Sequence, residues 1–204
     1  MSRETTSLVF SPDYLIDKYI DRSALERYFE ALMTHNQKVN LVSRETSPDD
    51  LVRLAAESVL PLEVLSAERD GVDVESYLDI GSGGGFPSVP ILLARNIETA
   101  RLVERTAKKA SVLEKIIEEL GLDAGIIPRN LEEIKFDRTF KLITLRYVKL
   151  TEPLLKKIYA LLNEGGHFVY YSATDIELHQ NRAHFYSFES SEPPVTKSFT
   201  IYEK

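Results

Sequence analysis

The sequence predicts an α/β fold in which helices pack on a mainly parallel sheet, with a helical segment preceding it. Short strands alternate with helices from residue 76 onward, and a glycine cluster ends the first strand of that run. Such alternation predicts βαβ crossovers and therefore a parallel sheet. We expect an N-terminal helical extension, 1–70, and a Rossmann-like core, 71–204, packed together as a single compact unit.

Two helices are predicted in the extension. Apolar side chains between Leu25 and Leu32 recur at helical spacing, which predicts a helix over residues 12–35. Residues 47–50 (SPDD) are a strong helix start, because a capping serine and a first-turn proline precede acids that favour the positive end of the helix dipole. This second helix is expected to continue to about Leu65.

Seven strands are expected in the core. Five of them are predicted to lie in the parallel part of the sheet, with three helices between them. A long helix that carries one apolar stripe and ends at Gly121 is the clearest of the three. The five strands and three helices are predicted at residues 77–80, 101–104, 124–127, 142–145 and 167–172 and at residues 87–95, 106–120 and 151–162. The tail is expected to add a helix near residues 174–184 and an antiparallel hairpin of two strands, 185–188 and 195–202.

The overall charge bears on the partner. The 204-residue chain carries a net charge of −7 at pH 7. Proteins that bind nucleic acid are usually basic, because neutralisation of phosphates drives the binding. The bulk charge therefore counts mildly against an RNA substrate, although a local basic face on an acidic protein is sufficient for one.

Several classes of site are excluded or disfavoured by composition. The chain has no cysteine, which excludes disulfides, thiolate-zinc sites and cysteine nucleophiles. Its four histidines have no zinc-like spacing with carboxylates, so we expect no metal. No apolar run approaches the ~18 residues that span a bilayer, and the N-terminus lacks the apolar region of a signal peptide. We therefore expect a cytoplasmic protein with no membrane partner, and we favour a monomer.

The most informative segment is the glycine loop at residues 79–87 (DIGSGGGFP), at a strand-to-helix turn. This is the ligand-binding crevice of parallel α/β sheets, and glycine lets a ligand approach the backbone closely. A dinucleotide site usually has the pattern G-x-G-x-x-G. Counted from Gly81, the third glycine is the bulky Phe86. Counted from Gly83 it is Ser88, which is tolerable, so the dinucleotide interpretation is weakened but stays open.

The loop instead has the pattern D-x-G-x-G-x-G, formed by Asp79, Gly81, Gly83 and Gly85, which is typical of methyltransferases that use S-adenosylmethionine. In that interpretation the glycines make room for the methionine moiety, and the following helix N-terminus favours its carboxylate. Glu104 ends the second strand of the core, where an acid can accept hydrogen bonds from the ribose hydroxyls. Together these residues predict a site for S-adenosyl-L-methionine.

Six segments, in order, resemble a known family. The chain from about His35 to Ser172 is similar to the RsmG family (also called glucose-inhibited division protein B, GidB), bacterial methyltransferases that act on guanine N7 of small-subunit (16S) ribosomal RNA. The glycine loop followed by Phe-Pro is the most specific of the matches. The matching segments are residues 36–42 (NQKVNLV), 53–58 (RLAAES), 79–87 (DIGSGGGFP), 103–113 (VERTAKKASVL), 129–134 (RNLEEI) and 145–147 (LRY).

The resemblance implies a fold and a set of site residues. The fold is the seven-stranded, class I sheet of S-adenosylmethionine-dependent methyltransferases with an N-terminal helical extension. Gly81 and Phe86 would contact the cofactor, and Leu131 and Glu132 would lie beside the adenine. Arg146 would border both the cofactor and the target pocket, and it is our candidate catalytic residue, holding the target base or the methionine end. The implied partner is ribosomal RNA or the small ribosomal subunit.

The chain departs from the family pattern on the face expected to meet RNA. The histidine after the family's arginine is Leu54 here, and the family's aspartate is Glu57. The glycine after the loop proline is Ser88, and the family's L-K-G after the fifth strand is replaced by residues 171–173 (YSA). The cofactor is therefore better supported than the RNA substrate.

The expected chemistry needs no general base. Guanine N7 carries an in-plane lone pair and no proton, so the protein has only to position it in line with the sulfonium methyl, which contributes roughly 7–11 kcal/mol of barrier lowering. The target guanine must be presented outside a base stack. Tyr170 and Tyr171 are candidates for stacking on it, although strand tyrosines more often pack. Lys108, Lys109 and Lys115 are candidate phosphate contacts, although a solvated face is the commoner role of such lysines.

Four functions are compatible with these residues. The first is a 16S rRNA guanine-N7 methyltransferase. The second uses the same cofactor on another RNA or a small molecule. The third is a degenerate relative that binds cofactor or RNA without turnover, and the fourth is a dinucleotide-dependent oxidoreductase.

Overall fold

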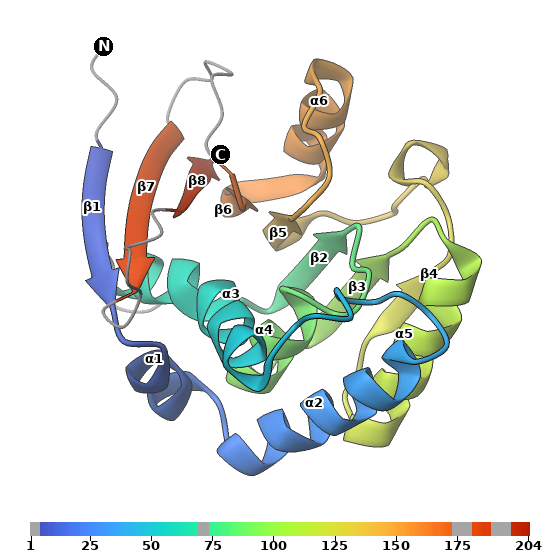
Figure 1. The fold of residues 1–204 in the computed structure, drawn as a ribbon. Coiled ribbons are helices and arrows are strands. Elements are labelled where there is room, and N and C mark those ends of the chain that lie inside the picture. The colour runs from blue at the N-terminus through green and yellow to red at the C-terminus, as the bar shows by residue number, and fades with distance from the viewer. Residues whose placement is uncertain (1–4, 69–73, 173–180, 189–196) are drawn as a thin grey trace.

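The computed structural model describes residues 5–68, 74–172, 181–188 and 197–204, which form an eight-stranded sheet with helices on both faces (Figure 1). The strand order is β1-β7-β8-β6-β5-β2-β3-β4. The strands are β1 (Thr5–Phe10), β2 (Ser76–Ile80), β3 (Thr99–Val103), β4 (Gly125–Ile127), β5 (Phe140–Leu145), β6 (Leu162–Tyr170), β7 (Asn181–Phe188) and β8 (Lys197–Glu203).

Five neighbouring strands, β6-β5-β2-β3-β4, run parallel and confirm the predicted α/β core. β2 and β5, in the middle, are buried along nearly their whole length, as expected for parallel strands covered on both faces. The chain passes from β2 outward to β3 and β4, then returns across β2 to form β5. The sheet therefore has a topological switch point between β2 and β5, where ligands of such sheets bind.

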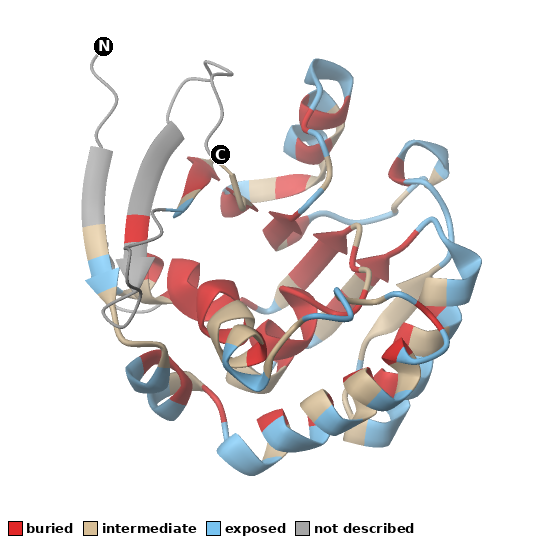
Figure 2. Ribbon diagram, in the orientation of Figure 1, coloured by how far each residue is buried: buried red, intermediate tan, exposed pale blue. Residues whose placement is uncertain are grey.

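The helices divide between the two faces of the sheet. Those of the N-terminal segment share one hydrophobic core with α4 and α5, whereas α6 packs in a second core on the opposite face. Buried residues follow the sheet and the helix sides that face it, and exposed residues lie on the outer sides (Figure 2). The helices are α1 (Pro12–Tyr19), α2 (Arg22–Asn36), α3 (Pro48–Glu68), α4 (Ser88–Ala94), α5 (Ala107–Leu120), α6 (Glu152–Leu161) and the 3-10 turn η1 (Leu131–Glu133).

The helix predicted over residues 12–35 is two helices. Ile20 has an extended backbone, with φ −130° and ψ 134°, and ends α1. Asp21 then caps α2, because its carboxylate accepts a hydrogen bond from the Ala24 backbone N–H at 2.9 Å. Apolar periodicity continues through the break, which is why the pattern alone predicted a single helix. Aspartate is a favoured N-cap residue, and Asp21 lies at the junction between the two helices.

The sheet also differs from the prediction at its outer edge. The hairpin is confirmed, because β7 pairs antiparallel with β8. The helix expected near residues 174–184 is wrong for residues 181–184, which belong to β7, and its remainder lies outside the described residues. An eighth strand, β1, pairs parallel with β7, so seven strands were one too few. β6 is longer than expected, because it begins at Leu162 and so includes Gly165 and Gly166, which lie before the predicted strand at residues 167–172.

The N-terminal helices are joined to the glycine loop. α2 packs against α4 and α5, and α3 packs against α1 and α4. The buried Tyr28 hydroxyl of α2 donates a hydrogen bond to the Gly84 carbonyl at 2.9 Å, and its ring lies 5.3 Å from that of Phe86. Helix α2 of the N-terminal segment thus holds the glycine loop in place. Within the described residues, no helix has the length and apolar character needed to cross a bilayer.

Candidate functional site

A cavity of about 1090 Å³ opens at the carboxyl ends of the parallel strands. The loops that follow β2, β3, β4 and β5 all contribute to its wall, together with the segment between α2 and α3. Because four strand ends converge on it at the switch point, this is the site that the topology predicts for a ligand. Residues from each of these loops are Gly81, Gly83, Glu104, Arg129, Leu131, Arg146, Tyr147 and Asn40.

The glycine loop bends sharply and stays close to β3. The Gly81 N–H donates to the Val103 carbonyl at 2.8 Å, and Gly81 has φ +78°. A Cβ atom on Gly81 would lie 2.6 Å from the side chain of Val148, so the turn requires glycine there. Gly83 has φ +53°, and the nearest atom to an added Cβ would be 3.8 Å away. Gly83 therefore presents bare backbone to open space in the cavity.

Glu104 faces the glycine loop rather than the bulk solvent. Its carboxylate accepts hydrogen bonds from the Gly83 N–H at 3.0 Å and from the Thr106 N–H at 2.7 Å. Its exposed fraction is 6%, yet it lines the cavity. Each carboxylate oxygen accepts more than one hydrogen bond, so Glu104 retains capacity for a ligand hydroxyl while it fixes the loop.

The remaining predicted site residues fall into two groups. Phe86, Leu131 and Glu132 line the cavity, as Gly81, Gly83, Glu104 and Arg146 do. Asp79 and Gly85 lie behind the lining: a Cβ on Gly85 would be 2.6 Å from Val89, so that glycine allows α4 to approach the loop.

Asp79 is fully buried beneath the loop. The Thr144 hydroxyl donates to its Oδ1 at 2.6 Å and is itself hydrogen-bonded to the Tyr77 hydroxyl at 2.8 Å. Burial raises the pKa of the Asp79 carboxyl, and the hydrogen bond from Thr144 only partly opposes that rise. In this position Asp79 holds the ends of β2 and β5 together.

Arg146 is held by a buried ionic network. It follows the last residue of β5, it is 4% exposed, and its guanidinium forms an ion pair with the fully buried Glu57 of α3. Lys197 of β8 forms an ion pair with the other Glu57 oxygen, and the Leu54 carbonyl accepts a hydrogen bond from Arg146 at 3.5 Å. Glu57 therefore compensates the positive charge of Arg146 in part, and the position of Arg146 at the cavity wall is fixed.

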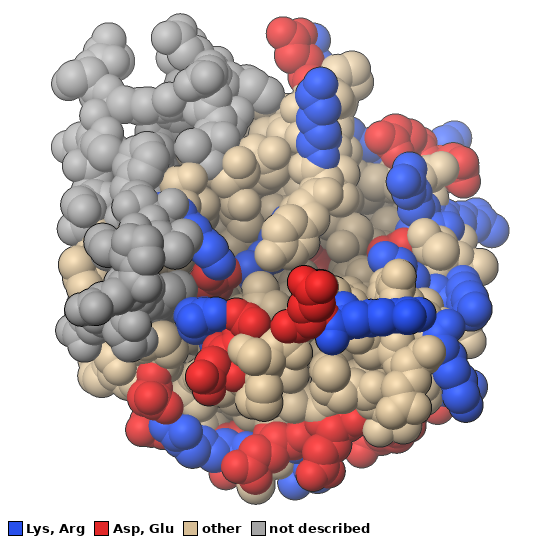
Figure 3. Space-filling view, in the orientation of Figure 1, with Lys and Arg blue, Asp and Glu red and all other residues tan. Residues whose placement is uncertain are grey.

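The rim of the cavity is basic, which the sequence analysis did not predict. Besides Arg146, five basic side chains line it, and none of these five has an ion-pair partner within the part of the chain that the structure describes. Basic side chains gather on the right of the face shown in Figure 3, whereas acidic ones are most numerous along its lower edge, over α2, with others at its centre, its top and its upper right. The five residues, here called the basic rim, are Arg44, Arg105, Lys109, Arg129 and Lys149.

The signal for the basic rim was present in the sequence, because Arg105, Arg129 and Lys149 each stand shortly after a predicted strand end. Of the three lysines considered as phosphate contacts, only Lys109 lines the cavity, while Lys108 and Lys115 are exposed on other sides of α5.

Two further pairs of residues have defined positions. Asn36 forms the turn after α2, where its side-chain oxygen accepts hydrogen bonds from the Leu41 N–H at 2.8 Å and the Val42 N–H at 3.1 Å, whereas Asn40 lines the cavity. Tyr171 is partly buried against the hydrophobic core, and its hydroxyl donates to the Ser58 carbonyl at 2.6 Å. Neither Tyr170 nor Tyr171 lines the cavity.

No metal centre is found in the described segments: they contain no group of three His, Cys, Asp or Glu side chains placed to hold a metal ion.

The chain is similar to known proteins in family, sequence and fold. A family model described as "rRNA small subunit methyltransferase G" (GidB) matches residues 21–200. A protein from Helicobacter pylori strain J99 with the name Ribosomal RNA small subunit methyltransferase G is 30% identical over 179 residues, covering 82% of this chain and 97% of that protein. A protein of the same name from Pelodictyon phaeoclathratiforme is 30% identical over 154 residues, 75% of this chain, and the match spans 65% of its length.

The solved structure of an O-methyltransferase from Bacillus cereus in complex with SAH has a similar fold, with a TM-score of 0.60 at 13% identity. The similarity covers 94% of this chain and 96% of that one. At this identity the likeness concerns the fold alone.

Proposed function

Because the chain belongs to the rRNA small subunit methyltransferase G (GidB) family, we propose that it transfers a methyl group from S-adenosyl-L-methionine to N7 of a guanine in small-subunit (16S) ribosomal RNA. The membership removes the reason for a dinucleotide-dependent oxidoreductase. The observation that carries the proposal is the cavity at the switch point, which joins a cradle of bare backbone to a basic rim.

The residues at the cavity fit the cofactor. An added Cβ at Gly83 would have no neighbour closer than the Gly81 carbonyl oxygen at 3.8 Å, so a ligand can approach the backbone of the loop, and the methionine end of the cofactor would lie there. Glu104 would accept hydrogen bonds from the ribose hydroxyls, and Leu131 and Glu132 would flank the adenine. With Gly81 and Phe86, these residues form a continuous wall from β4 to β2.

The reaction places few chemical demands on the protein. When bound, the cofactor supplies an electrophilic methyl group on a sulfonium. The residues around the cavity would hold the guanine so that its N7 lone pair lies in line with that methyl group. No proton has to leave N7, so the protein contributes positioning and electrostatics rather than a general base.

Arg146 would hold the base or the methionine carboxylate without opposing the cationic reaction. A bare guanidinium beside a sulfonium would repel it. The fully buried Glu57 offsets part of that charge, since it is paired with Arg146 as well as with the partly exposed Lys197. The ion pair would therefore allow the Arg146 guanidinium to donate hydrogen bonds beside a positively charged ligand.

The substrate is supported by local charge. The net charge of −7 is unfavourable for RNA, but the basic rim concentrates positive charge at the entrance. Phosphates of a single-stranded or splayed RNA segment would contact this rim while one base enters the cavity. A different RNA or a small molecule remains the alternative substrate, favoured by Leu54 lining the cavity where the family pattern has histidine.

The decisive experiment is methyl transfer to small ribosomal subunits that lack the modification, with S-adenosylmethionine carrying a labelled methyl group. We expect label in 16S rRNA, mapped to N7 of one guanine, and none in subunits that already carry the modification. A separate titration measures S-adenosylhomocysteine binding. Tight binding without label in any RNA would contradict the proposed activity and identify a non-catalytic relative, whereas label at another atom would change only the target.

A further inference from the structure

One aromatic side chain at the cavity is exposed in an unusual way. Tyr147 directly follows Arg146, lines the cavity and is 82% exposed, more than any other large hydrophobic residue in the described ranges. Its backbone has φ 58°, the left-handed conformation, and no other non-glycine residue of the described segments has a positive φ. A bulky residue in this conformation is unfavourable for folding, and such strain concentrates at functional sites.

The ring is presented by the charged network behind it. The Arg146 guanidinium lies over the Tyr147 ring, 5.0 Å from its centroid, and 5.3 Å from the centroid of Tyr171. Because Glu57 and the Leu54 carbonyl fix Arg146, the cation is a rigid support for the ring that lies on it. One face of Tyr147 is covered in this way, and its high exposure leaves the opposite face open.

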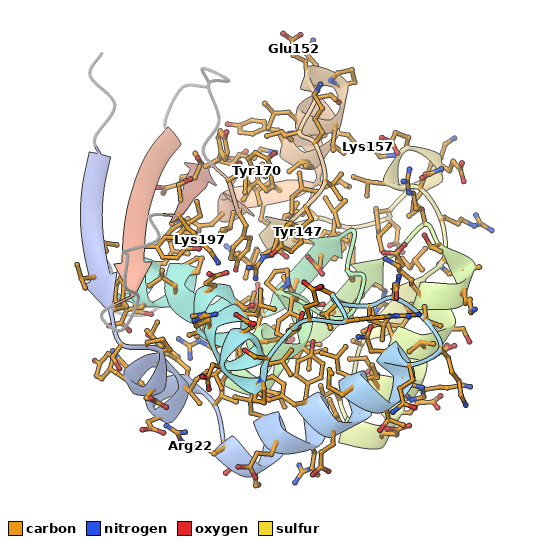
Figure 4. All side chains as sticks on the ribbon, in the orientation of Figure 1. Arg22, Tyr147, Glu152, Lys157, Tyr170 and Lys197 are labelled. Carbon is orange, nitrogen blue, oxygen red and sulfur yellow. The ribbon has the colours of Figure 1, made fainter. Side chains whose placement is uncertain are left out.

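The position of the ring matches the reacting end of the site. Glu104 and Leu131 lie at the ends of β3 and β4, on the side assigned to ribose and adenine. Tyr147 lies after β5, on the other side of the glycine loop, at the centre of the face shown in Figure 4. A target base that approaches the methyl group must therefore enter along the β5 side.

We propose that Tyr147 is the platform on which the target guanine stacks, an assignment that rests on the proposed function. The lone pair of N7 lies in the plane of the base, so fixing that plane also aims the lone pair at the methyl group. A tyrosine ring stacks on any base and gives affinity and orientation rather than base identity. Recognition of guanine would then depend on hydrogen bonds elsewhere in the cavity.

Three substitutions separate stacking from bulk. Tyr147→Phe and Tyr147→Trp keep an aromatic face, while Tyr147→Leu keeps an apolar side chain without one. We expect kcat/KM for unmodified small subunits to fall roughly 5- to 150-fold in Tyr147→Leu, the loss that corresponds to one base–aromatic stack. The two aromatic variants should retain activity within about threefold, and S-adenosylhomocysteine affinity should be unchanged in all three.

Tyr159 supplies a matched control. It is also an exposed tyrosine, 41% accessible, with the Lys204 ammonium 5.3 Å from its ring centroid, but it does not line the cavity. Tyr159→Leu should leave kcat/KM unchanged. Full activity of Tyr147→Leu would overturn the inference, as would an equal loss of S-adenosylhomocysteine binding, which would make Tyr147 a cofactor contact. A wild-type protein that binds S-adenosylhomocysteine but methylates no subunit contradicts the proposed function itself.

Discussion

Arg146, which follows β5, and Glu57 of α3 form an ion pair that is shielded from water on both sides, with 4% of the Arg146 side chain and none of Glu57 exposed. The pair joins the N-terminal helical segment to the end of the sheet where the cavity opens. A buried pair adds little to stability compared with an apolar pair, because both ions lose their hydration. Loss of one partner is costly, because the other charge then stays buried without compensation.

Glu57→Gln should therefore destabilise the protein by about 3–5 kcal/mol. The measurement is the free energy of unfolding from denaturant titration. Arg53→Gln on the same helix is the control, since Arg53 pairs with Asp50 where both side chains are partly exposed. Such a pair contributes about 0–1 kcal/mol. Equal losses of unfolding free energy in the two variants would mean that the buried ion pair contributes no more to stability than the partly exposed one.

Gly83→Asn should abolish or strongly weaken S-adenosylhomocysteine binding, because the new side chain occupies the space in front of the loop. Asparagine tolerates the left-handed backbone of Gly83 better than other non-glycine residues, so the fold should survive. Gly121→Asn is the matched control: it has φ +67°, no atom within 4 Å of an added Cβ and a position at the end of α5. Isothermal titration of both variants with S-adenosylhomocysteine measures this. Unimpaired binding by Gly83→Asn would mean that the glycine loop does not contact the cofactor.

Arg129→Gln should weaken binding of 16S rRNA and make it less sensitive to salt. If Arg129 of the basic rim contacts one phosphate, the slope of log K against log salt concentration should decrease by about 0.7–0.9. Lys115→Gln removes the same charge from an exposed position that does not line the cavity. RNA binding is measured by filter retention at several salt concentrations. The slope for Lys115→Gln should equal that of the wild-type protein. An equal change in both variants would show that only net charge matters.

Asp79→Asn should stabilise the protein at neutral pH. Burial raises the pKa of the Asp79 carboxyl in the folded state above its ordinary value. Between those two values the folded protein binds more protons than the unfolded chain, so the contribution of Asp79 to stability falls as pH rises. Asparagine keeps an acceptor for the Thr144 hydroxyl but does not titrate.

The difference in unfolding free energy between Asp79→Asn and wild type should consequently grow as pH rises from about 4 toward 7. Denaturant titrations at several pH values measure it. For Asp123→Asn, at an exposed position, the difference in unfolding free energy from wild type should stay constant over the same pH range. A difference of the opposite sign would mean that the buried carboxylate is stabilised when charged.

Much of the parallel core could be predicted because its signals are local. The strand ending at Ile80 stops at a glycine cluster, and α5 begins after Thr106 and ends at Gly121 as expected. β1 was missed because its stability depends on pairing with β7, at the opposite end of the sequence. Propensity over six residues cannot indicate a partner that far away.

The site shows the same division. The glycine loop and Glu104 were predictable, since close approach to backbone and an acid at a strand end have recognisable sequence patterns. The exposed ring of Tyr147 was not predictable, and the basic rim was predictable only in part. The sequence places three of its members shortly after strand ends, but exposure and the meeting of side chains from separate loops are properties of the tertiary arrangement. Residue types alone do not distinguish Lys109, at the cavity, from Lys108 beside it.

The parallel pairing of β1 with β7 places Thr5 opposite Ala183 and Phe10 opposite Phe188. A ribosome that makes this chain releases β1 before the parallel core and β7 only after it, because the strands of that core lie between them in the sequence. The outermost seam of the sheet therefore cannot close until the parallel core has been synthesised.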